Sequence, residues 1–421
     1  MILSFSIKNF RSIKDESLLS FIADTEINEH DTSLSKTDKF EILPVAGIYG
    51  ANASGKTSIL QALGFFFVLT QKSFGFAGDN SLLKSLYLPY LFDDYSSHQP
   101  IELELNFLVN DIRYQYGFSF THERIISEWL YDYSTSDIKT IFTRDWIEHH
   151  YSYTNVKGTL NEQIYLPNQH ALLLSVLMST SHETGKILAK FFFSRLYSIE
   201  PTDQSLINSQ NITKKLIDET AIDKNEVLEF LQCADFNIHD FAIEQIAVNK
   251  SQFPPILHGV LGENPQQLKI TTYHKSENTM YALDFNQESR GTQATFNHSG
   301  AIIDTIKRGG ILLFDEINSS LHPLLVRYII NLFMNKEINK HGAQLLFTTH
   351  DTSLLDSKIL RKDQIWFCDK DSKNISTKLY ALIDFKKNDF SNMEFAYLYG
   401  KFAAIPNVKD SFHLSNEVSN G

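Results

Sequence analysis

The residues with the clearest chemistry form the stretch Gly50–Thr57, GANASGKT, which fits the phosphate-binding pattern G-x-x-x-x-G-K-[ST] without a mismatch. Its glycines let the backbone wrap closely round a triphosphate, so that successive N–H groups point at anionic oxygens. Lys56 would reach the β- and γ-phosphates, and the Thr57 hydroxyl would ligate Mg²⁺. We expect a nucleoside triphosphate as ligand. The residues predicted to hold it here are Asn52, Ser54, Gly55, Lys56, Thr57 and Ser58.

A strand that ends in two acids is the second feature with chemistry. The apolar run Ile311–Phe314 is followed by Asp315 and Glu316. Asp315 would sit at the carboxyl end of the strand and hold the Mg²⁺ hydration shell facing Thr57. Glu316 would reach a water behind the γ-phosphate as the general base. Solvated acids at an ordinary strand exit are the alternative, which the phosphate loop makes less favourable.

Two further motifs follow the same logic. His350 lies within Thr348–Asp351, at the end of the apolar strand Gln344–Phe347, where it could act as a γ-phosphate sensor or orient water. Ser289 and the Gly291 N–H, within Glu288–Thr292, would offer a second anion site at the start of a helix. A structural histidine and a plain helix N-cap are the alternatives for these two motifs.

The elements that must position these residues follow from hydrophobic periodicity. A buried strand at Pro44–Tyr49 and a helix with apolar residues from Ile59 to Phe67 flank the phosphate loop, which is the context the motif requires. Other strands are expected at Ile2–Ile7, Leu18–Ile22, Ile101–Val109, Ile112–Phe120, Ile126–Tyr133, Thr140–Arg144, Tyr151–Asn155, Ile243–Val248, Leu268–Thr272, Met280–Asp284 and Gln364–Cys368. Other helices are expected at Ala171–Met178, Ile187–Leu196, Gln293–Lys307 and Leu324–Asn335, and a more polar pair of helices is expected within Asn211–Cys233.

These elements predict an α/β fold with a parallel core sheet shared by both ends of the chain. An antiparallel β lobe lies in the N-terminal half and a helical lobe is inserted in the middle. We expect 1–157 to hold the phosphate loop and the antiparallel lobe. The helical lobe would span 158–235, and 236–421 would carry the remaining motifs.

Composition sets the class of protein. The 421 residues are 43% hydrophobic and 21% charged, as in soluble globular proteins. The net charge of −12 argues against coating DNA through a global field, although a local basic groove stays open. The two distant cysteines, Cys233 and Cys368, suggest neither disulfides nor a zinc site. This cysteine usage makes the cytoplasm the expected compartment. No apolar run of membrane-spanning length is visible.

The motif order resembles that of the ABC-type ATPases of the SMC and RecF branch. A phosphate loop is followed by a long insertion, Ser289–Thr292, the acid pair and His350. The start Asn9–Ser12 is also similar to theirs, and the resemblance implies that Arg11 lies against the phosphates. It further implies ATP and Mg²⁺ as cofactors, ATP hydrolysis, and an ABC-type fold with a mixed core sheet.

More closely, the chain resembles ATPase subunits of bacterial phage-defence systems. These are the RloA and AbiL abortive-infection ATPases, related to the overcoming-lysogenization-defect, PtuA and AriA ATPases. The supporting marks are Ser289–Thr292 in place of the transporter signature, Leu321–Pro323, and the tail Gly400–Asn407. This resemblance implies a separate effector subunit, a nuclease, and a trigger that is DNA or phage-derived; no membrane partner is expected.

In this class the Ser289–Thr292 element contacts the γ-phosphate held by a second copy, which implies a homodimer or higher homo-oligomer around ATP. This sequence departs from the motif pattern of that class in two ways. The Mg²⁺-sensing glutamine is not obvious, with Gln163 and Gln169 as candidates. His322 replaces an aspartate, so the contact across copies would fall to Ser319 or Ser320.

Other functions stay open at this point. A RecF-like repair ATPase that clamps DNA would require DNA-stimulated hydrolysis and a basic groove. A transporter subunit is disfavoured by the missing signature. GTP specificity is disfavoured because Asn249–Gln252 lacks the guanine-reading aspartate. A built-in nuclease is disfavoured because Asp369–Asp371 has no partner glutamate and too few residues follow it for another domain.

Overall fold

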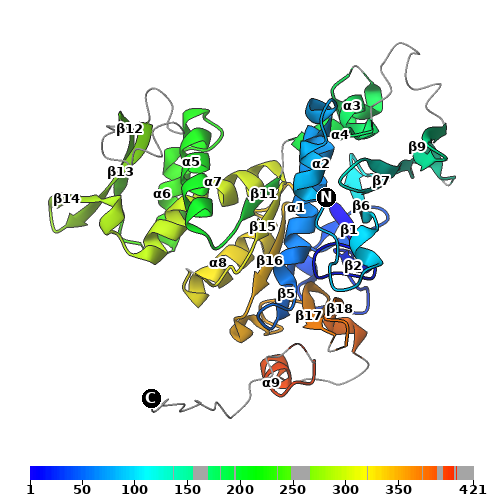
Figure 1. Cartoon of the computed structure of the whole chain (residues 1–421). Helices are drawn as coiled ribbons and strands as arrows, with labels where there is room; N and C mark the ends of the chain where they lie inside the picture. The colour runs from blue at the N-terminus through cyan, green and yellow to red at the C-terminus, as the bar shows by residue number, and fades with distance from the viewer. Residues whose placement is uncertain are drawn as a thin grey trace, which may run out of the picture.

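A computed structural model gives the arrangement of the chain (Figure 1). It describes residues 1–135, 137–154, 169–180, 182–193, 196–234, 236–247, 266–319, 321–371, 373–385, 392–402 and 404. The candidates Gln163 and Ser320, the stretch Asn249–Gln252 and the end of the motif Gly400–Asn407 lie outside these residues.

A six-stranded sheet in the order β11-β15-β16-β5-β17-β18 forms the core. Every pairing in it is parallel except that of β17 with the edge strand β18. The bounds are β5 Val45–Gly50, β11 Leu196–Ile199, β15 Ile311–Phe314, β16 Gln344–Thr349, β17 Ile365–Lys370 and β18 Thr377–Ala381. Its central strands read as continuous apolar runs because both faces of a parallel sheet are covered. The predicted mixed core sheet, shared by both ends of the chain, is confirmed.

A seven-stranded antiparallel sheet in the order β10-β9-β8-β7-β6-β1-β2 forms the second layer. The strands are β1 Ile2–Lys8, β2 Ser17–Ser20, β6 Ile101–Val109, β7 Ile112–Phe120, β8 Ile125–Asp132, β9 Lys139–Ile147 and β10 His150–Thr154. The predicted antiparallel lobe is confirmed, and the N-terminal β1 extends it by pairing with β6. A two-stranded sheet, β3 Ser35–Lys36 and β4 Glu41–Ile42, is separate.

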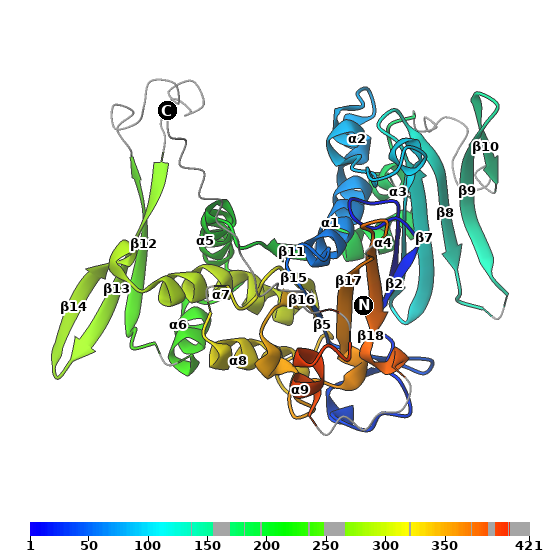
Figure 2. The ribbon, with the colours of Figure 1, turned by 60° about the horizontal axis from the view of Figure 1, so that its bottom comes forward.

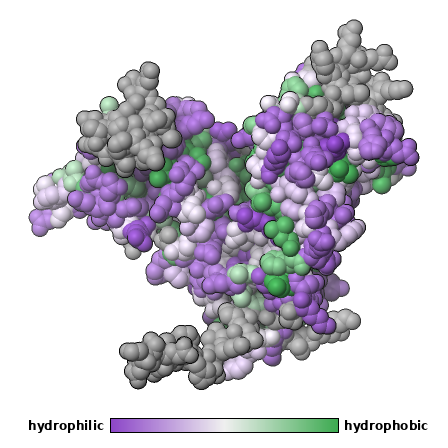
Figure 3. Space-filling model, viewed as in Figure 1, coloured by the Kyte–Doolittle hydropathy of each residue, from purple (hydrophilic) through white to green (hydrophobic). Residues whose placement is uncertain are grey.

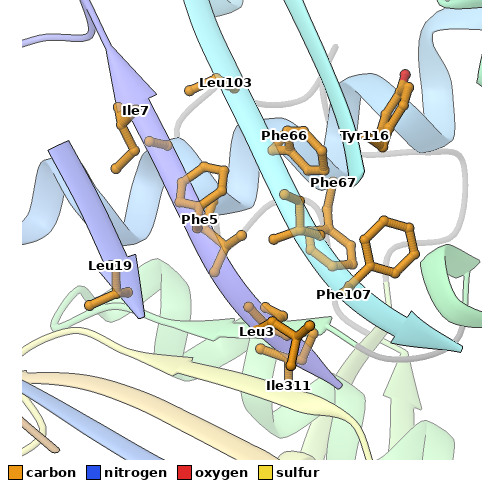
Figure 4. Close-up of a cluster of buried hydrophobic side chains, with 14 of the residues drawn as sticks. Leu3, Phe5, Ile7, Leu19, Phe66, Phe67, Leu103, Phe107, Tyr116 and Ile311 are labelled. Carbon is orange, nitrogen blue, oxygen red and sulfur yellow. The ribbon is translucent and has the colours of Figure 1, made fainter. Parts of the chain in front are cut away.

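Helix α1, Lys56–Lys72, lies between the two large sheets (Figures 1 and 4). Phe66 stacks on Phe118 of β7 with ring centroids 5.0 Å apart, and Ile311 of β15 belongs to the same core cluster. The stretch Lys56–Phe76 is long and apolar enough to cross a membrane, but half of its most apolar window is buried inside the protein. Its contacts with both sheets explain the apolar composition as that of a core helix.

A separate arm carries the segment that contains Ser289 (Figure 2). It comprises α5 Asp203–Asp218, α6 Lys224–Cys233, β12 Asp240–Ala247, β13 Gln266–Ser276, β14 Thr279–Asp284 and the start of α7 Arg290–Arg308. Phe241, Phe285 and Phe296 form part of its own small core. Figure 3 shows this arm and the antiparallel lobe diverging, with a hollow between them.

The remaining helices cover the two large sheets. They are α2 Ser81–Leu86, α3 Leu173–Met178, α4 Glu183–Phe193, α8 Pro323–Met334 and α9 Met393–Leu398. The core clusters show α3 and α4 packing with α1 and the antiparallel sheet, whereas α8 and α9 pack on the opposite face of the core sheet.

One expectation about the helical region is wrong. The helix predicted to reach Leu196 ends at Phe193, and Leu196 begins β11, a strand of the core sheet. Four residues are too few to show a strand period, and β11 exists because it pairs with the distant β15. The stretch 158–235 therefore contains a core strand as well as helices, and its use as a separate lobe remains a prediction.

Candidate nucleotide-binding site

The phosphate loop joins the buried strand β5 to α1, as its sequence predicts. Gly55 has φ +109°, and a Cβ there would come within 2.0 Å of the Thr377 hydroxyl oxygen. At Gly50 a Cβ would come within 2.3 Å of the Cys368 carbonyl oxygen. Both conformation and space therefore require glycine at these positions. The loop is shaped by β17 and β18 as well as by its own sequence.

Lys56 is folded against this loop. Its ammonium group donates hydrogen bonds to the carbonyl oxygens of Gly50 at 2.8 Å and Ala51 at 3.0 Å. Burial lowers its pKa, while nearby Glu316 and Asp315 act in the opposite direction. A triphosphate would present charged acceptors stronger than these two carbonyl groups. The contact of Lys56 with phosphate remains a prediction.

One hydrogen bond brings the phosphate loop and the acid pair together. The Thr57 hydroxyl donates to Asp315 Oδ2 at 2.8 Å. The two residues follow different strands, β5 and β15, which are separated in the sheet by β16. Asp315 is only 6% exposed, so its carboxylate is fixed by the surrounding structure. This pair is the one predicted to hold Mg²⁺.

Glu316 and His350 also lie together. Glu316 Oε1 is 3.5 Å from His350 Nε2, and both side chains are partly exposed. Glu316 has φ +49°, a strained value for a residue with a side chain, and it lines the cavity over the phosphate loop. A strained backbone at a polar, accessible carboxylate is typical of functional positions. The predicted roles of general base and sensor are compatible with this geometry.

A cavity of about 700 Å³ covers the phosphate loop. One wall is polar and includes Arg11, which is predicted to face phosphate. The backbone N–H of Arg11 donates a hydrogen bond to the Leu88 carbonyl at 2.7 Å. The other wall is formed by Tyr87, Leu88, Pro89, Leu91 and Phe92. Sequence reasoning missed this apolar wall, because a short run of apolar residues outside a helix or strand carries no periodic signal. The exposure of Leu91 (72%) and Phe92 (60%) suits a surface that a planar base would cover.

The Ser289 segment lies elsewhere. The Ser289 hydroxyl accepts a hydrogen bond from the Thr292 N–H at 3.1 Å and caps α7. Ser289 and Arg290 are exposed, Gly291 is half-buried and Thr292 is buried. These four residues are not among those that line the cavity. Within one chain, the structure therefore does not bring the second predicted anion site to the phosphate loop.

The chemistry of the loop fits a magnesium–triphosphate complex. The Ser54 hydroxyl oxygen is buried beside the loop and has no hydrogen-bond partner in the described structure. Among the described residues there is no cluster of three or more His, Cys, Asp or Glu side chains that could hold a metal by itself. Thr57 and Asp315 would therefore share Mg²⁺ with phosphate oxygens, which is the coordination that Mg²⁺ commonly adopts.

The structure partly explains the two points at which this sequence departs from the motif pattern of the ATPase class. Gln169 lies beside His170 before α3 and does not line the cavity. His322 Nδ1 accepts from the Leu324 N–H at 3.2 Å, so this histidine caps α8. Ser319 is exposed next to the acid pair. Its proposed contact with a second copy remains a prediction.

Comparison with known families gives the class of protein. The model described as "AAA domain, putative AbiEii toxin, Type IV TA system" matches residues 45–155 and 170–356, more than half of the chain. The chain belongs to this AAA family. The match runs from β5 to just beyond His350, so it includes the phosphate loop, the acid pair and the histidine.

Solved structures resemble this AAA-family chain at low identity. An SMC head bound to the C-terminal winged-helix domain of ScpA has a TM-score of 0.44 and 14% identity, covering 91% of this chain and 98% of that one. The SMC head domain from Thermotoga maritima has a TM-score of 0.40 and 12% identity, covering 90% and 98%. A dimeric ATP-binding cassette with ADP and phosphate has a TM-score of 0.31 and 12% identity, covering 90% and 98%. Likenesses with TM-scores below 0.5 say nothing about function. No curated protein matched the sequence.

Proposed function

We propose that this protein binds and hydrolyses ATP as the controlling subunit of a cytoplasmic anti-phage defence complex. The observation that carries the ATPase proposal is the 2.8 Å hydrogen bond from Thr57 to Asp315. It joins the end of the phosphate loop to the acid pair beneath a cavity large enough for a nucleotide. Membership of an AAA family supports the same assignment.

Each residue has a definite role in this proposal. Lys56 and the loop N–H groups bind the β- and γ-phosphates, Arg11 on the polar wall contacts the phosphates, and the apolar wall covers the base. Mg²⁺, held by Thr57 and Asp315, would neutralise charge that develops on the phosphates. Glu316 accepts a proton from the attacking water, and His350 orients that water or senses the γ-phosphate.

The homodimer belongs to the same proposal. Ser289 and Arg290 are exposed at the start of α7, on an arm whose residues do not line the cavity of their own chain. An exposed helix N-terminus can accept an anion from outside the chain. A two-fold pair of copies would let each Ser289–Thr292 segment meet the γ-phosphate of the other copy. Hydrolysis would then remove the contact that favours the closed dimer.

The defence role rests on the sequence resemblance and on the family description. That description names a putative toxin of a toxin–antitoxin system, which supports a growth-arresting role for the system to which this chain belongs. We propose a separate nuclease as the effector, and DNA or a phage-derived molecule as the trigger. Capture of the native protein from infected and uninfected cells, followed by mass spectrometry, would identify both. Plaque assays with wild-type and Lys56→Ala operons test the role: protection that survives loss of nucleotide binding would contradict it.

Two variants test the ATPase and the dimer. Glu316→Gln should bind ATP, turn over about 10²–10⁴ times more slowly and elute as a dimer with ATP, because the general base is lost while the binding groups remain. Lys56→Ala should stay monomeric with ATP. Phosphate release and gel filtration with light scattering measure the two outcomes. A Glu316→Gln monomer at saturating ATP would contradict the sandwich. Strong stimulation of the wild-type ATPase by DNA would favour the RecF-like alternative.

A further inference from the structure

Thr348, the penultimate residue of β16, contacts three consecutive residues of the acid-pair segment. Its hydroxyl donates to Asp315 Oδ1 at 2.6 Å, and the same oxygen accepts from the Glu316 N–H at 2.7 Å. Its backbone carbonyl accepts from the Ile317 N–H at 3.0 Å. Thr348 has no exposed surface. One buried side chain therefore holds the predicted metal ligand and the backbone of the predicted general base.

The order of the strands in the core sheet explains why Thr348 can hold the acid pair. Because β16 lies between β15 and β5, the carboxyl end of β16 is placed between the acid pair and the phosphate loop. Thr57 and Thr348 occupy the two oxygens of the Asp315 carboxylate, one each. A carboxylate with one bond to each oxygen has its plane fixed, so that it cannot rotate away from Mg²⁺.

The hydrogen bond between the Glu316 N–H and Thr348 helps to hold the strained backbone conformation of Glu316. Glu316 has φ +49°, a conformation that costs on the order of 1 kcal/mol or more for a residue with a side chain. The Glu316 N–H is part-buried, and the partner to which it donates is the Thr348 hydroxyl. The Thr348 hydroxyl accepts this N–H while giving its own proton to the carboxylate, so both of its hydrogen-bonding functions serve the acid pair.

A similar pair of hydrogen bonds holds the backbone of His350. The hydroxyl of Thr349 donates to Asn318 Oδ1 at 2.8 Å, and the same amide oxygen accepts from the His350 N–H at 3.4 Å. The end of β16 is thus tied to the acid-pair loop at two successive residues. A buried threonine that served only the sheet would bond to a neighbouring backbone group rather than to the acid pair.

We propose that Thr348 is a positioning residue for hydrolysis, which fixes Asp315 toward Mg²⁺ and Glu316 toward the attacking water. The proposal rests on the ATPase function proposed above. It assigns to Thr348 no contact with substrate. Its expected signature is a loss of turnover and of metal affinity, with the affinity for ATP preserved.

Three variants of the full-length protein test it. Thr348→Val keeps the shape and removes the hydroxyl, and Thr348→Ser keeps the hydroxyl. The matched control is Thr305→Val, because Thr305 is also buried and its hydroxyl donates to the Ala301 carbonyl of its own helix. The measurements are kcat and KM for ATP, and Mn²⁺ binding by electron paramagnetic resonance with a non-hydrolysable ATP analogue. If Thr348→Val does not fold, Thr348→Ala takes its place.

Thr348→Val should lower kcat about tenfold to a hundredfold, as expected for misplaced groups, with KM close to wild type. It should raise the half-saturating Mn²⁺ concentration about tenfold, as for a lost outer-shell contact. Thr348→Ser and Thr305→Val should behave as wild type. Unchanged kcat and Mn²⁺ binding in Thr348→Val, or equal damage in Thr348→Ser, would overturn the proposal. If wild type does not hydrolyse ATP, the proposed function fails, and the Mn²⁺ titration alone still decides the role of Thr348.

Discussion

His298 is a buried histidine at the contact between α7 and the acid-pair strand. It is 4% exposed, and its ring lies edge-on to Phe314, the residue before Asp315, with centroids 5.2 Å apart. Its Nδ1 has no hydrogen-bond partner among the described residues. Burial lowers the pKa of His298 to about 4 from the usual 6.5. The helix that begins at Ser289 therefore meets the acid pair through an uncharged imidazole.

The free energy of unfolding should depend on pH through this residue. As the pH falls from 6.5 to about 4, the unfolded chain binds a proton at His298 and the folded chain does not, so stability is lost in that window. The loss should be on the order of 3 kcal/mol. Urea unfolding of wild type and His298→Leu, compared at about pH 7 and about pH 4, measures it. The variant should lose less stability on acidification, whereas equal losses would contradict the assignment.

At the scale of elements, a buried ion pair joins two strands to a helix. Glu128 of β8 and Arg144 of β9 are both fully buried and lie 2.8 Å apart. The Glu128 carboxylate also accepts the N–H groups of Leu173 and Leu174, at the start of α3, and the Tyr116 hydroxyl. Glu128 thereby fixes α3, which packs against α1, to the antiparallel sheet.

Breaking this pair should weaken the whole antiparallel lobe. Arg144→Met leaves Glu128 buried without its counter-charge and should cost about 3–5 kcal/mol of unfolding free energy. Urea denaturation measures the change. Lys215→Met is the control, because Lys215 and its partner Glu219 are both well exposed at 3.8 Å, where an ion pair contributes about 1 kcal/mol or less. Similar losses in the two variants would show that the buried pair has no special role.

The parts of the fold that can be predicted from the sequence are those whose structure depends on residues close together in the chain. The phosphate loop, the strand before Asp315 and the N-cap at Ser289 have fixed spacings and regular periods, and each has the predicted local structure. Strand β11 was missed because its only reason to be a strand is a partner more than a hundred residues away. The apolar wall at Leu91 and the contacts of Thr348 were missed for the same reason: neither function is visible until distant segments are placed together.

At the scale of the whole molecule, the predicted catalytic groups lie on two separate parts. The phosphate loop, acid pair and His350 meet at the carboxyl edge of the core sheet, whereas the Ser289–Thr292 segment begins α7 on the arm with β12–β14 (Figure 2). Glu288, just before it, is bonded to His274 of β13 at 2.7 Å, which attaches the segment to the arm. A rigid attachment of this kind suits a group that must be presented to another molecule.

If two copies complete each other's sites, two inactive variants should restore activity when mixed. Lys56→Ala cannot hold ATP, and Ser289→Arg places a large side chain where the γ-phosphate of the other copy would approach. A mixed dimer has one damaged site and one site built from the intact loop of the second variant and the intact segment of the first. Equal amounts should restore ATPase activity in proportion to the fraction of mixed dimers, up to about one half of the wild-type value, because each mixed dimer has one working site.

Phosphate release measures this recovery, and native mass spectrometry counts the mixed dimers. The control mixes Lys56→Ala with Glu316→Ala. Both changes lie on the phosphate-loop side, so every site in that mixture contains a defect and no activity should return. Recovery in the first mixture alone requires that Ser289 act on the ATP of the other copy. Mixed dimers without recovery would mean that Ser289 serves its own chain or none, and the N-cap of α7 would then be its whole function.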